Sequence, residues 1–480
     1  MENNWREYTL DDLCHKITDG SHQSPKAFDG GIPMYSVKDM NDHGFNRAGA
    51  KTISVQDYEK LLAQGCQPEV NDILIAKDGS VMKHVFKVDI NERCALLSSI
   101  AILKPKEELI DPDFLVFSIL NPIVKNNILS NYVSGSGVPR IVLKDFKKVV
   151  VRVPNLAIQK EIAKIILNQN QKILLNKQIN QTLEQMAQAL FKSWFVDFDP
   201  VFDNALASGM AVNDFPEALQ KKALARQQQR QQEPSADKER EAKALPEAAS
   251  ASEELAKRFP SEFEQTDEPS IGINGWIPKG WKVSKFKEAI DQYIDNRGKT
   301  PPLCEEGIPL IEVKHLPENT NFPILNSEKQ VTEDTFKTWF RKHVEEKDIL
   351  ISTVGTIGRT SFVKNTRLGI AQNLLGLRFG KIVNPEYMFY TIKGHKFQHD
   401  VDARLVTTVQ ASIKRKDLDT IDILVPSHCI QNKFSELVGT YIDSQYCKSQ
   451  AISGLELIRD TLLPKLISGE LTIPKAKDCA

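Results

Sequence analysis

The chain has 480 residues, of which 41% are hydrophobic, and its formal net charge at pH 7 is −1. This length predicts two or more domains, and no apolar run approaches the roughly 20 residues that a membrane-spanning helix needs. The start, MENNWREYTLDD, has neither the basic nor the apolar region of a secretory signal. The seven scattered cysteines argue against a CxxC metal site or a disulfide framework and favour a reducing, cytoplasmic setting.

The near-neutral total hides an uneven distribution of charge. Residues 203–268 hold 9 basic and 14 acidic residues, so the remainder of the chain carries a net charge of +4. A weakly basic remainder is compatible with a nucleic-acid partner without requiring one.

Residues 1–154 mix short β-rich runs with turn signals. DILIA at 72–76 and SIAIL at 99–103 are typical of strands. DPDFLVFSIL at 111–120 predicts a helix with proline near its start. We therefore expect an α+β domain with a substantial sheet.

Residues 155–203 form a predicted helical region. Apolar residues recur every three or four positions from Ile158 to Leu190, which predicts a long helix. The stretch LFKSWFVDFDPV at 190–201 then crowds aromatic residues together, and we interpret it as the end of that helix, packed against another part of the chain. A catalytic role for Asp197 and Asp199 is disfavoured because no base or nucleophile lies nearby in the sequence.

Residues 204–275 occur once and are rich in Gln, Ala, Glu and Lys. We expect this insertion to be partly helical, with a linker around Pro234 and Ser235. The preferred interpretation is a solvated spacer, and the alternative is a helix that extends a partner-binding surface.

The second half of the chain repeats the first. GIPMYSVKDM at 31–40 matches GIPLIEVKHL at 307–316, and NDILIAKDGSV at 71–81 matches KDILISTVGTI at 347–357, both with an offset of 276 residues. SSIAILK and QNLLGLR follow at an offset of 274, and AIQ and CIQ at an offset of 272. The repeat predicts a second α+β domain at 276–426, a C-terminal helical region at 427–472 and a tail at 473–480.

Each repeat ends in a helix whose apolar face has no complete partner in its own domain. Helices of the predicted length, about 33 residues, would extend roughly 50 Å. We predict that they pair as an antiparallel coiled coil that separates two α+β domains, with polar patches at 168–172 and 444–450 setting the register. The alternative is that each helix packs on its own domain.

Sequence motifs for catalysis are scarce. We find no [DN]PP[FY] methyltransferase motif, no phosphate-binding GxxxxGK[ST] loop and no HExxH zinc motif. Glu312-Val-Lys314 could end a nuclease motif, but its repeat counterpart, Ser36-Val-Lys38, lacks the carboxylate. Two similar, non-identical modules at a fixed separation instead suit the reading of two half-sites on a polymer such as DNA.

In this order, the motifs resemble those of the specificity subunit of a Type I restriction–modification enzyme, from end to end. GSHQSPKAFDGGIPMYSVKDM and RGKTPPLCEEGIPLIEVKHL resemble the openings of two target recognition domains. VPNLAIQKEIAKII and VPSHCIQNKF resemble the starts of the two conserved helices.

The resemblance implies a chain without catalytic activity, cofactor or metal of its own. Each target recognition domain would read one half of a bipartite, asymmetric site in double-stranded DNA. The helices would set the gap and dock two modification subunits, which bind S-adenosylmethionine and methylate adenine. Restriction subunits that use ATP and Mg²⁺ would complete the enzyme.

Candidate DNA-binding residues are polar or basic side chains on loops, because these contact base edges and phosphates. We choose the loops that follow the glycine turns and those that precede the last strand of each domain. In the first domain and then the second, the candidates are Lys38, Lys77, Lys83, His84, Lys87, Ser134, Ser136, Arg140, Lys314, Arg359, Thr360, Lys364, Thr407, Thr408, Gln410, Lys414 and Arg415. For each of them the alternative is an ordinary surface residue.

The aromatic stretch offers a second kind of site. Trp194 and Phe195 are candidates for docking a modification subunit if they are partly exposed, although packing within the chain is preferred. Two other functions stay open at this point: a scaffold that binds only proteins, and an autonomous nuclease.

Overall fold

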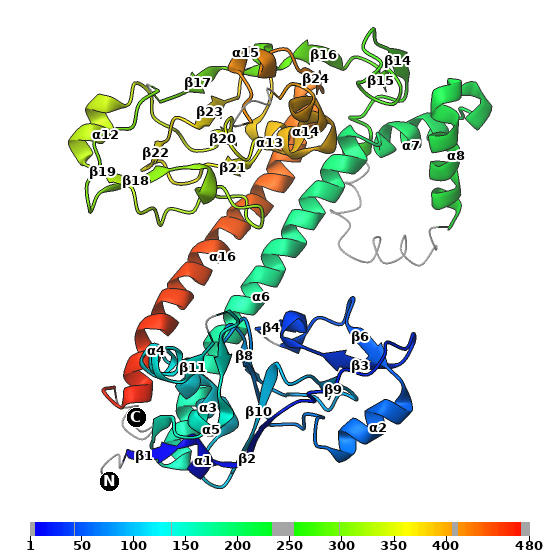
Figure 1. Cartoon of the computed structure of the whole chain (residues 1–480). Helices are drawn as coiled ribbons and strands as arrows, with labels where there is room; N and C mark the ends of the chain where they lie inside the picture. The colour runs from blue at the N-terminus through cyan, green and yellow to red at the C-terminus, as the bar shows by residue number, and fades with distance from the viewer. Residues whose placement is uncertain are drawn as a thin grey trace, which may run out of the picture. The chain divides into compact units, whose positions relative to one another are not determined.

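The computed structural model describes residues 5–42, 44–135, 137–232, 254–296, 298–405 and 411–471. The chain forms two compact units, unit 1 with Met1–Asn176 and Ala451–Ala480, and unit 2 with Lys177–Gln450. Each unit contains one α+β domain together with segments of two long helices, α6 (Leu156–Phe195) and α16 (His428–Ser468) (Figure 1).

Unit 1 is built around an antiparallel four-stranded sheet in the order β2–β10–β7–β8. Its strands are β2 (Cys14–Asp19), β7 (Ile73–Ala76), β8 (Val85–Lys87) and β10 (Ile100–Pro105). Every residue of β7 is buried, as expected for its continuous apolar run. Smaller sheets pair β6 (Lys51–Ile53), β3 (Ile32–Tyr35) and β9 (Ala95–Leu96); β1 (Arg6–Thr9) and β13 (Val150–Val153); β11 (Val133–Ser134) and β12 (Arg140–Ile141); and β4 (Met40–Asn41) and β5 (Gly44–Phe45).

Unit 2 repeats this arrangement with the sheet order β17–β23–β20–β21. These strands are β17 (Gln292–Ile294), β20 (Ile349–Ser352), β21 (Thr360–Phe362) and β23 (Leu374–Arg378). The match in strand order confirms the duplicated α+β domain predicted from the sequence. The smaller sheets pair β19 (Gln330–Val331), β18 (Ile308–Ile311) and β22 (Gly369–Ile370); β16 (Lys282–Lys285) and β24 (Asp422–Val425); and β14 (Phe263–Gln265) and β15 (Trp276–Pro278).

Short helices occupy equivalent places in the two domains. Proline stands at the start of α3 and of α13, where its missing N–H is not needed. The helices of unit 1 and then unit 2 are α1 (Leu10–Leu13), η1 (Val37–Asp39), α2 (Val55–Ala63), α3 (Pro112–Leu120), α4 (Pro122–Asn131), α5 (Leu143–Phe146), α11 (Phe286–Ala289), η3 (Val313–His315), α12 (Glu333–Trp339), α13 (Pro385–Lys393), α14 (His395–Asp402) and α15 (Arg415–Leu418).

The long helices have 40 and 41 residues, longer than the predicted 33, and at 1.5 Å per residue each extends about 60 Å. In unit 2 the Asn180 amide donates to the Ser449 hydroxyl at 3.1 Å, and the Gln445 amide donates to the Asn180 carbonyl at 3.1 Å. In unit 1 the Arg459 guanidinium donates to the Asn170 side chain at 3.4 Å. Within each unit polar contacts therefore join the two helix segments, which run antiparallel (Figure 1). Asn170, Gln445 and Ser449 belong to the predicted patches, but their partners Arg459 and Asn180 lie outside them. Among the described helices, none is both long and apolar enough to cross a membrane.

A buried glutamine fastens α6 to the domain of unit 1. Gln159 is 1% exposed, and its amide nitrogen donates to the carbonyls of Leu109 (3.0 Å) and Pro154 (2.9 Å). Its side-chain oxygen accepts the N–H of Asp111 at 2.8 Å. The glutamine thus joins the exit of the last strand, the start of α3 and the first turns of α6.

The same arrangement fastens α16 in unit 2. Gln431 is fully buried and donates to the carbonyls of Ile382 (3.3 Å) and Pro426 (2.8 Å), while it accepts the N–H of Asn384 at 2.9 Å. This pair of glutamine clamps explains the repeated AIQ and CIQ motifs, because each clamp needs a side chain with two donors and an acceptor at this position.

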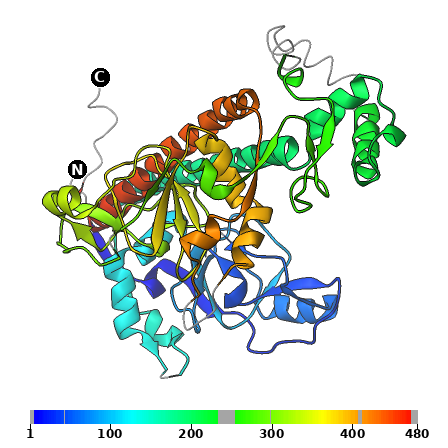
Figure 2. The same cartoon turned by 90° about the horizontal axis from the view of Figure 1, so that it is seen from above.

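The insertion after α6 packs into unit 2. Phe198 has a φ of 55° and separates α6 from α7 (Asp199–Ala207), which is followed by η2 (Val212–Asp214) and α8 (Glu217–Gln232). The Phe202 ring lies 4.7 Å from Phe263 and 5.6 Å from Phe215. Figures 1 and 2 show α7 and α8 beside the β14–β15 hairpin. The interpretation as a solvated spacer is therefore wrong for the described part of this segment; Pro234 and Ser235 lie outside the described residues.

The aromatic end of α6 is also part of the core of unit 2. Trp194 and Phe195 are each 5% exposed. The Trp194 ring lies 5.0 Å from Phe259, and the Phe195 ring lies 4.8 Å from Tyr387 and 5.1 Å from Phe434. The preferred interpretation, packing within the chain, matches this burial. The two side chains are not available as the docking surface considered as the alternative.

Loss of a glutamine clamp should destabilise the chain. Gln159→Met or Gln431→Met leaves one peptide N–H and two carbonyls unpaired in a buried site, which should lower the free energy of unfolding by roughly 2 kcal/mol or more. Urea unfolding followed by circular dichroism measures the effect. Gln171→Met, at an exposed position of α6, is the control; equal stability of all three variants would contradict the assigned role.

Truncation of Trp194 should act through the core. Trp194→Ala removes most of a buried indole and should lower the free energy of unfolding by roughly 3–5 kcal/mol, whereas Val196→Ala, at a position 49% exposed, should have little effect. Chemical unfolding of both variants tests this. A Trp194→Ala chain of unchanged stability that fails to bind its expected partner subunits would instead support a docking role.

Candidate nucleic-acid interface

Loops from distant parts of the sequence meet at one end of the sheet in unit 1. Lys77 N–H donates to the Ser99 carbonyl at 2.9 Å, Gly79 N–H to the Pro139 carbonyl at 2.8 Å, and Ile141 N–H to the Lys77 carbonyl at 3.0 Å. We call this meeting point of the segments 77–79, 97–99 and 139–141 the loop junction of unit 1.

Unit 2 has an equivalent loop junction, formed by the segments 353–355, 371–373 and 411–413. Thr353 N–H donates to the Asn373 carbonyl (3.0 Å), Gly355 N–H to the Ala411 carbonyl (3.1 Å), and Ile413 N–H to the Thr353 carbonyl (3.0 Å). Each of these bonds is the repeat counterpart of one in unit 1. The loops chosen from the sequence therefore do converge, and they do so on a duplicated backbone scaffold.

A glycine with positive φ shapes the turn in each junction. Gly79 has a φ of 75° and Gly355 a φ of 86°. Glycine adopts this left-handed region at little cost, whereas side chains with a Cβ disfavour it. This requirement accounts for the glycine shared by the DGS and VGT turns of the repeat.

The predicted residues of unit 1 differ in their availability. Lys77 is only 6% exposed, and its ammonium lies 3.3 Å from Asp19 and 3.1 Å from Asp78. It is therefore neutralised inside the junction and is not placed to contact phosphate. Arg140 is exposed and pairs with Ser134, also exposed, across the β11–β12 hairpin.

The other candidates of unit 1 lie around the junction or away from it. Lys38 and Lys83 are exposed. His84 lies 2.8 Å from Asp42. Lys87 pairs with Asp113 at 2.8 Å and Asp89 at 3.2 Å, at the end of β8 that is remote from the turn. Burial opposes the charge of Lys87, but these two carboxylates raise its pKa. Its ammonium group is therefore engaged in ion pairs within the domain and is not free to contact a ligand. Ser136 lies outside the described residues.

Several basic candidates of unit 2 already have partners. Lys364 is 12% exposed and pairs with Glu346 and Asp443, both at 2.6 Å, which fixes it inside the unit. The Arg415 guanidinium stacks 3.5 Å from the centre of the Tyr293 ring. Of the remaining candidates of unit 2, Thr360 is half-buried at the start of β21 and Lys414 is exposed. Thr407, Thr408 and Gln410 lie outside the described residues.

Two basic positions of unit 2 remain close to solvent. Arg359 follows the glycine turn and forms an ion pair at 3.1 Å with Glu318, a side chain that is 78% exposed. Lys314 lies on η3 at the place that Lys38 occupies on η1, and it pairs with the exposed Glu328 at 3.1 Å. Exposed partners of this kind are weakly held and can be exchanged for phosphate.

A polar hollow of about 230 Å³, which was not predicted from the sequence, lies beside the junction of unit 2. Asn296, Gln372 and Asn373 line it, together with the ion pair of Glu312 and Lys329, whose charged atoms are 2.7 Å apart. The signal lay in the aligned SSIAILK and QNLLGLR segments, where Gln372 and Asn373 stand opposite Ser98 and Ser99.

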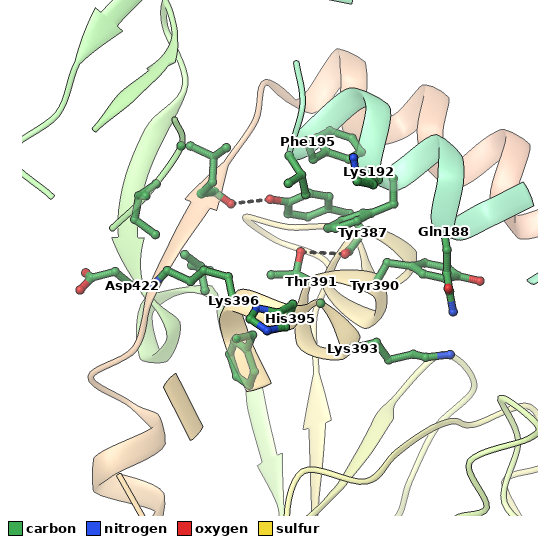
Figure 3. A pocket seen from close by; sticks show the side chains of 18 of the residues that line it. Gln188, Lys192, Phe195, Tyr387, Tyr390, Thr391, Lys393, His395, Lys396 and Asp422 are labelled. Atoms are coloured by element: carbon green, nitrogen blue, oxygen red, sulfur yellow. Dashed lines mark hydrogen bonds between the residues drawn. The ribbon is translucent and has the colours of Figure 1, made fainter. Parts of the chain in front are cut away.

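A larger hollow of about 500 Å³ lies where α6 meets α13 and β24 in unit 2 (Figure 3). Tyr387 is buried there and donates its hydroxyl hydrogen to the Leu424 carbonyl at 2.6 Å. Three lysines line the hollow, but each is paired: Lys192 with Asp197, Lys393 with Glu184 and Lys396 with Asp400. These lysines are neutralised, so this hollow is a poor site for a nucleic-acid backbone.

Glu184 is the centre of a polar network beside this hollow. It accepts hydrogen bonds from Lys393 (2.5 Å), Asn321 (2.5 Å) and Tyr390 (2.9 Å). Burial alone would raise the pKa of Glu184, but the Lys393 ammonium and the hydrogen bonds from Lys393 and Asn321 hold it below its usual value. The network therefore contains a charged carboxylate at neutral pH.

Known proteins are similar to this chain in sequence and fold. Residues 2–185 match the family described as the Type I restriction modification DNA specificity domain. Over 379 residues the chain is 26% identical to the Type I restriction enzyme HindI specificity subunit of Haemophilus influenzae, covering 77% of this chain and 80% of that protein. The first part of the chain thus matches this domain family, and most of the chain is similar to a Type I restriction enzyme specificity subunit.

A second relative and a solved structure show the same similarity. The MjaIX specificity subunit of Methanocaldococcus jannaschii is 23% identical over 377 residues, covering 76% of this chain and 71% of that protein. The crystal structure of the S subunit from M. genitalium shares the fold, with a TM-score of 0.57 at 14% identity and coverage of 97% and 96%. The relatives are named specificity subunits, in agreement with the expectation that this chain is not itself catalytic.

Proposed function

We propose that this chain is a specificity subunit that reads a bipartite, asymmetric sequence in double-stranded DNA, with each loop junction directed at one half-site. The observation that carries the proposal is the duplicated junction: three equivalent backbone hydrogen bonds hold it in each unit, while its side chains differ. A constant backbone with variable side chains suits two readers that approach DNA in the same way but recognise different base pairs.

Phosphate contacts would come from the exposed basic residues around each junction. Lys38 and Lys314 occupy the same position on η1 and η3, and Arg140 and Arg359 lie on loops that form or adjoin the junctions. Such contacts fix the position of a protein on the duplex but carry no sequence information. The near-neutral net charge of the chain is compatible with this if partner subunits supply further phosphate contacts.

The paired helices would set the gap between the half-sites and dock two modification subunits. Exposed apolar side chains on the segments of unit 1 support a docking role: Leu174 is 43% exposed, Leu175 55% and Leu457 69%. Exposed apolar residues that lie together on a soluble protein often mark an interaction site. In this proposal the modification subunits bind S-adenosylmethionine and methylate adenine, and restriction subunits supply the chemistry that needs ATP and Mg²⁺.

Modular recognition predicts the result of a domain exchange. When residues 1–150 are replaced by the corresponding domain of another specificity subunit, one half of the methylated sequence should change and the other half and the gap should stay the same. Sequencing of methylated DNA from cells with the modification subunits measures this. The reciprocal exchange of residues 276–426 is the control and should change only the other half; a change in both halves after one exchange would refute modular recognition.

Loss of a single junction arginine should weaken DNA binding without unfolding the chain. Arg140→Ala or Arg359→Ala should lower the affinity for the cognate site by roughly tenfold or more. Gel shift with the modification subunits present gives the affinity, and circular dichroism verifies folding.

Matched controls for this experiment lie on equivalent helices of the two units. Lys60 on α2 is 72% exposed and Lys337 on α12 is 68% exposed, and neither belongs to the segments that form the junctions. Lys60→Ala and Lys337→Ala should leave binding almost unchanged. Equal affinities for all four variants would exclude the chosen loops, and a complex that shows no sequence-specific shift would favour the scaffold that binds only proteins.

A further inference from the structure

The two loop junctions differ in how closely a neighbouring loop approaches them. In unit 1 the Ser21 N–H donates directly to the Leu96 carbonyl at 2.8 Å. A Cβ placed on Gly20 would lie 2.2 Å from that same carbonyl oxygen, so the backbone fills the space and no side chain fits.

In unit 2 a side chain bonds to the equivalent carbonyl. Ile370 is the repeat counterpart of Leu96, and its carbonyl accepts a hydrogen bond at 3.0 Å from the amide nitrogen of Asn296. Asn296 is in turn the counterpart of Gly20, because the strand partners of Ile294 and Thr18 are equivalent residues of the repeat. Because Asn296 has a Cβ, its backbone cannot approach this carbonyl as closely as that of Gly20 does, and the hollow of about 230 Å³ lies beside it.

Amide groups give this hollow a defined chemistry. The side-chain oxygens of Asn296 and Asn373 are buried and have no hydrogen-bond partner among the described residues. Gln372 is exposed at the rim, and within the described part of the chain its side chain makes no hydrogen bond. Buried carbonyl oxygens that lack a donor are costly, so the hollow favours a ligand that offers N–H groups.

The four bases differ in whether the groups that they expose in the major groove can pair with these amides. Adenine and cytosine present an amino group there, whereas guanine and thymine present oxygen acceptors that the amide oxygens would repel. Adenine also offers N7, which can accept a hydrogen bond from the Gln372 amide while the Gln372 oxygen accepts from the adenine amino group. Cytosine has no such acceptor at the corresponding position. Adenine therefore pairs with both the amide nitrogen and the amide oxygen of Gln372, and cytosine with the oxygen alone.

We propose that Gln372, supported by Asn296 and Asn373, recognises the adenine of an A·T base pair in the half-site read by unit 2. The inference rests on the proposed function and deepens it by naming one recognised base pair and its reader. Unit 1 has Gly20, Ser98 and Ser99 at the equivalent positions and therefore lacks this reader.

The first test gives unit 2 the side chain that unit 1 has. Gln372→Ser is expressed as the full chain with its modification subunits, and methylated DNA is sequenced. One A·T position in one half of the sequence should become degenerate, while the other half keeps every specified base pair. Gln178→Ser, at an exposed position on the segment of α6 in unit 2, is the matched control and should leave the whole sequence unchanged.

The second test identifies the atoms that are read. In a gel shift with the same complex, purine (no amino group) or 7-deazaadenine (no N7) replaces the adenine identified above. Each analogue should weaken binding by the wild-type chain about tenfold or more. The same analogue should reduce the affinity of the Gln372→Ser chain much less, because that chain has already lost the interaction with the adenine.

The outcomes separate this inference from the proposed function. If the wild-type chain directs a bipartite sequence and Gln372→Ser leaves that sequence intact, the assignment of Gln372 is overturned while the proposed function stands. Degeneracy at a G·C position would overturn the choice of adenine. If no methylated sequence depends on the chain at all, the proposed function is overturned together with this inference.

Discussion

A buried glutamine at the start of each long helix is the constraint on which both units depend. Within the described part of the chain, Gln159 and Gln431 bind only backbone groups: two carbonyls and one N–H each. Because backbone groups do not change when side chains diverge, the direction in which each helix leaves its domain is independent of most of the domain's sequence. The loops at the sheet end can therefore vary without disturbing the attachment of the helix.

The loop junctions are also held together by hydrogen bonds to backbone groups, at a different place in each domain. Their three hydrogen bonds are again between backbone groups, and a glycine turn supplies the geometry. On this constant scaffold, unit 1 closes its junction with Lys77 held between Asp19 and Asp78, whereas unit 2 leaves amide groups around a hollow. The difference between the two loop junctions thus lies in a few side chains, since the sheet order is common to both units.

Most of the architecture could be predicted from the sequence because duplication leaves matching motifs in the strands, the turns and the long helices. The offsets align strands with strands and glutamine with glutamine, and helical periodicity marks α6 and α16. The site was harder to predict. Lys77 has the sequence context of an exposed loop cation, and only the fold brings Asp19 beside it. Phe215 is an isolated aromatic in a polar segment, so its burial beside Phe263 depends on a hairpin far along the chain. The hollow depends on a loop distance that no local pattern encodes.

The two domains also differ in how they rest on the helices. In unit 2 the half-buried carboxylate of Glu184 binds Lys393, Asn321 and Tyr390, whereas the counterparts of Lys393 and Tyr390 in unit 1 are Leu120 and Phe117. A partly buried ion pair contributes little net stability because the desolvation of both charges offsets their attraction. It does penalise arrangements that separate the charges, since each would then lie partly out of water without a partner. Apolar packing tolerates small rotations far better. The domain of unit 2 is therefore held on α6 by directional interactions, and these would fix the orientation of its loop junction more strictly than stability alone requires.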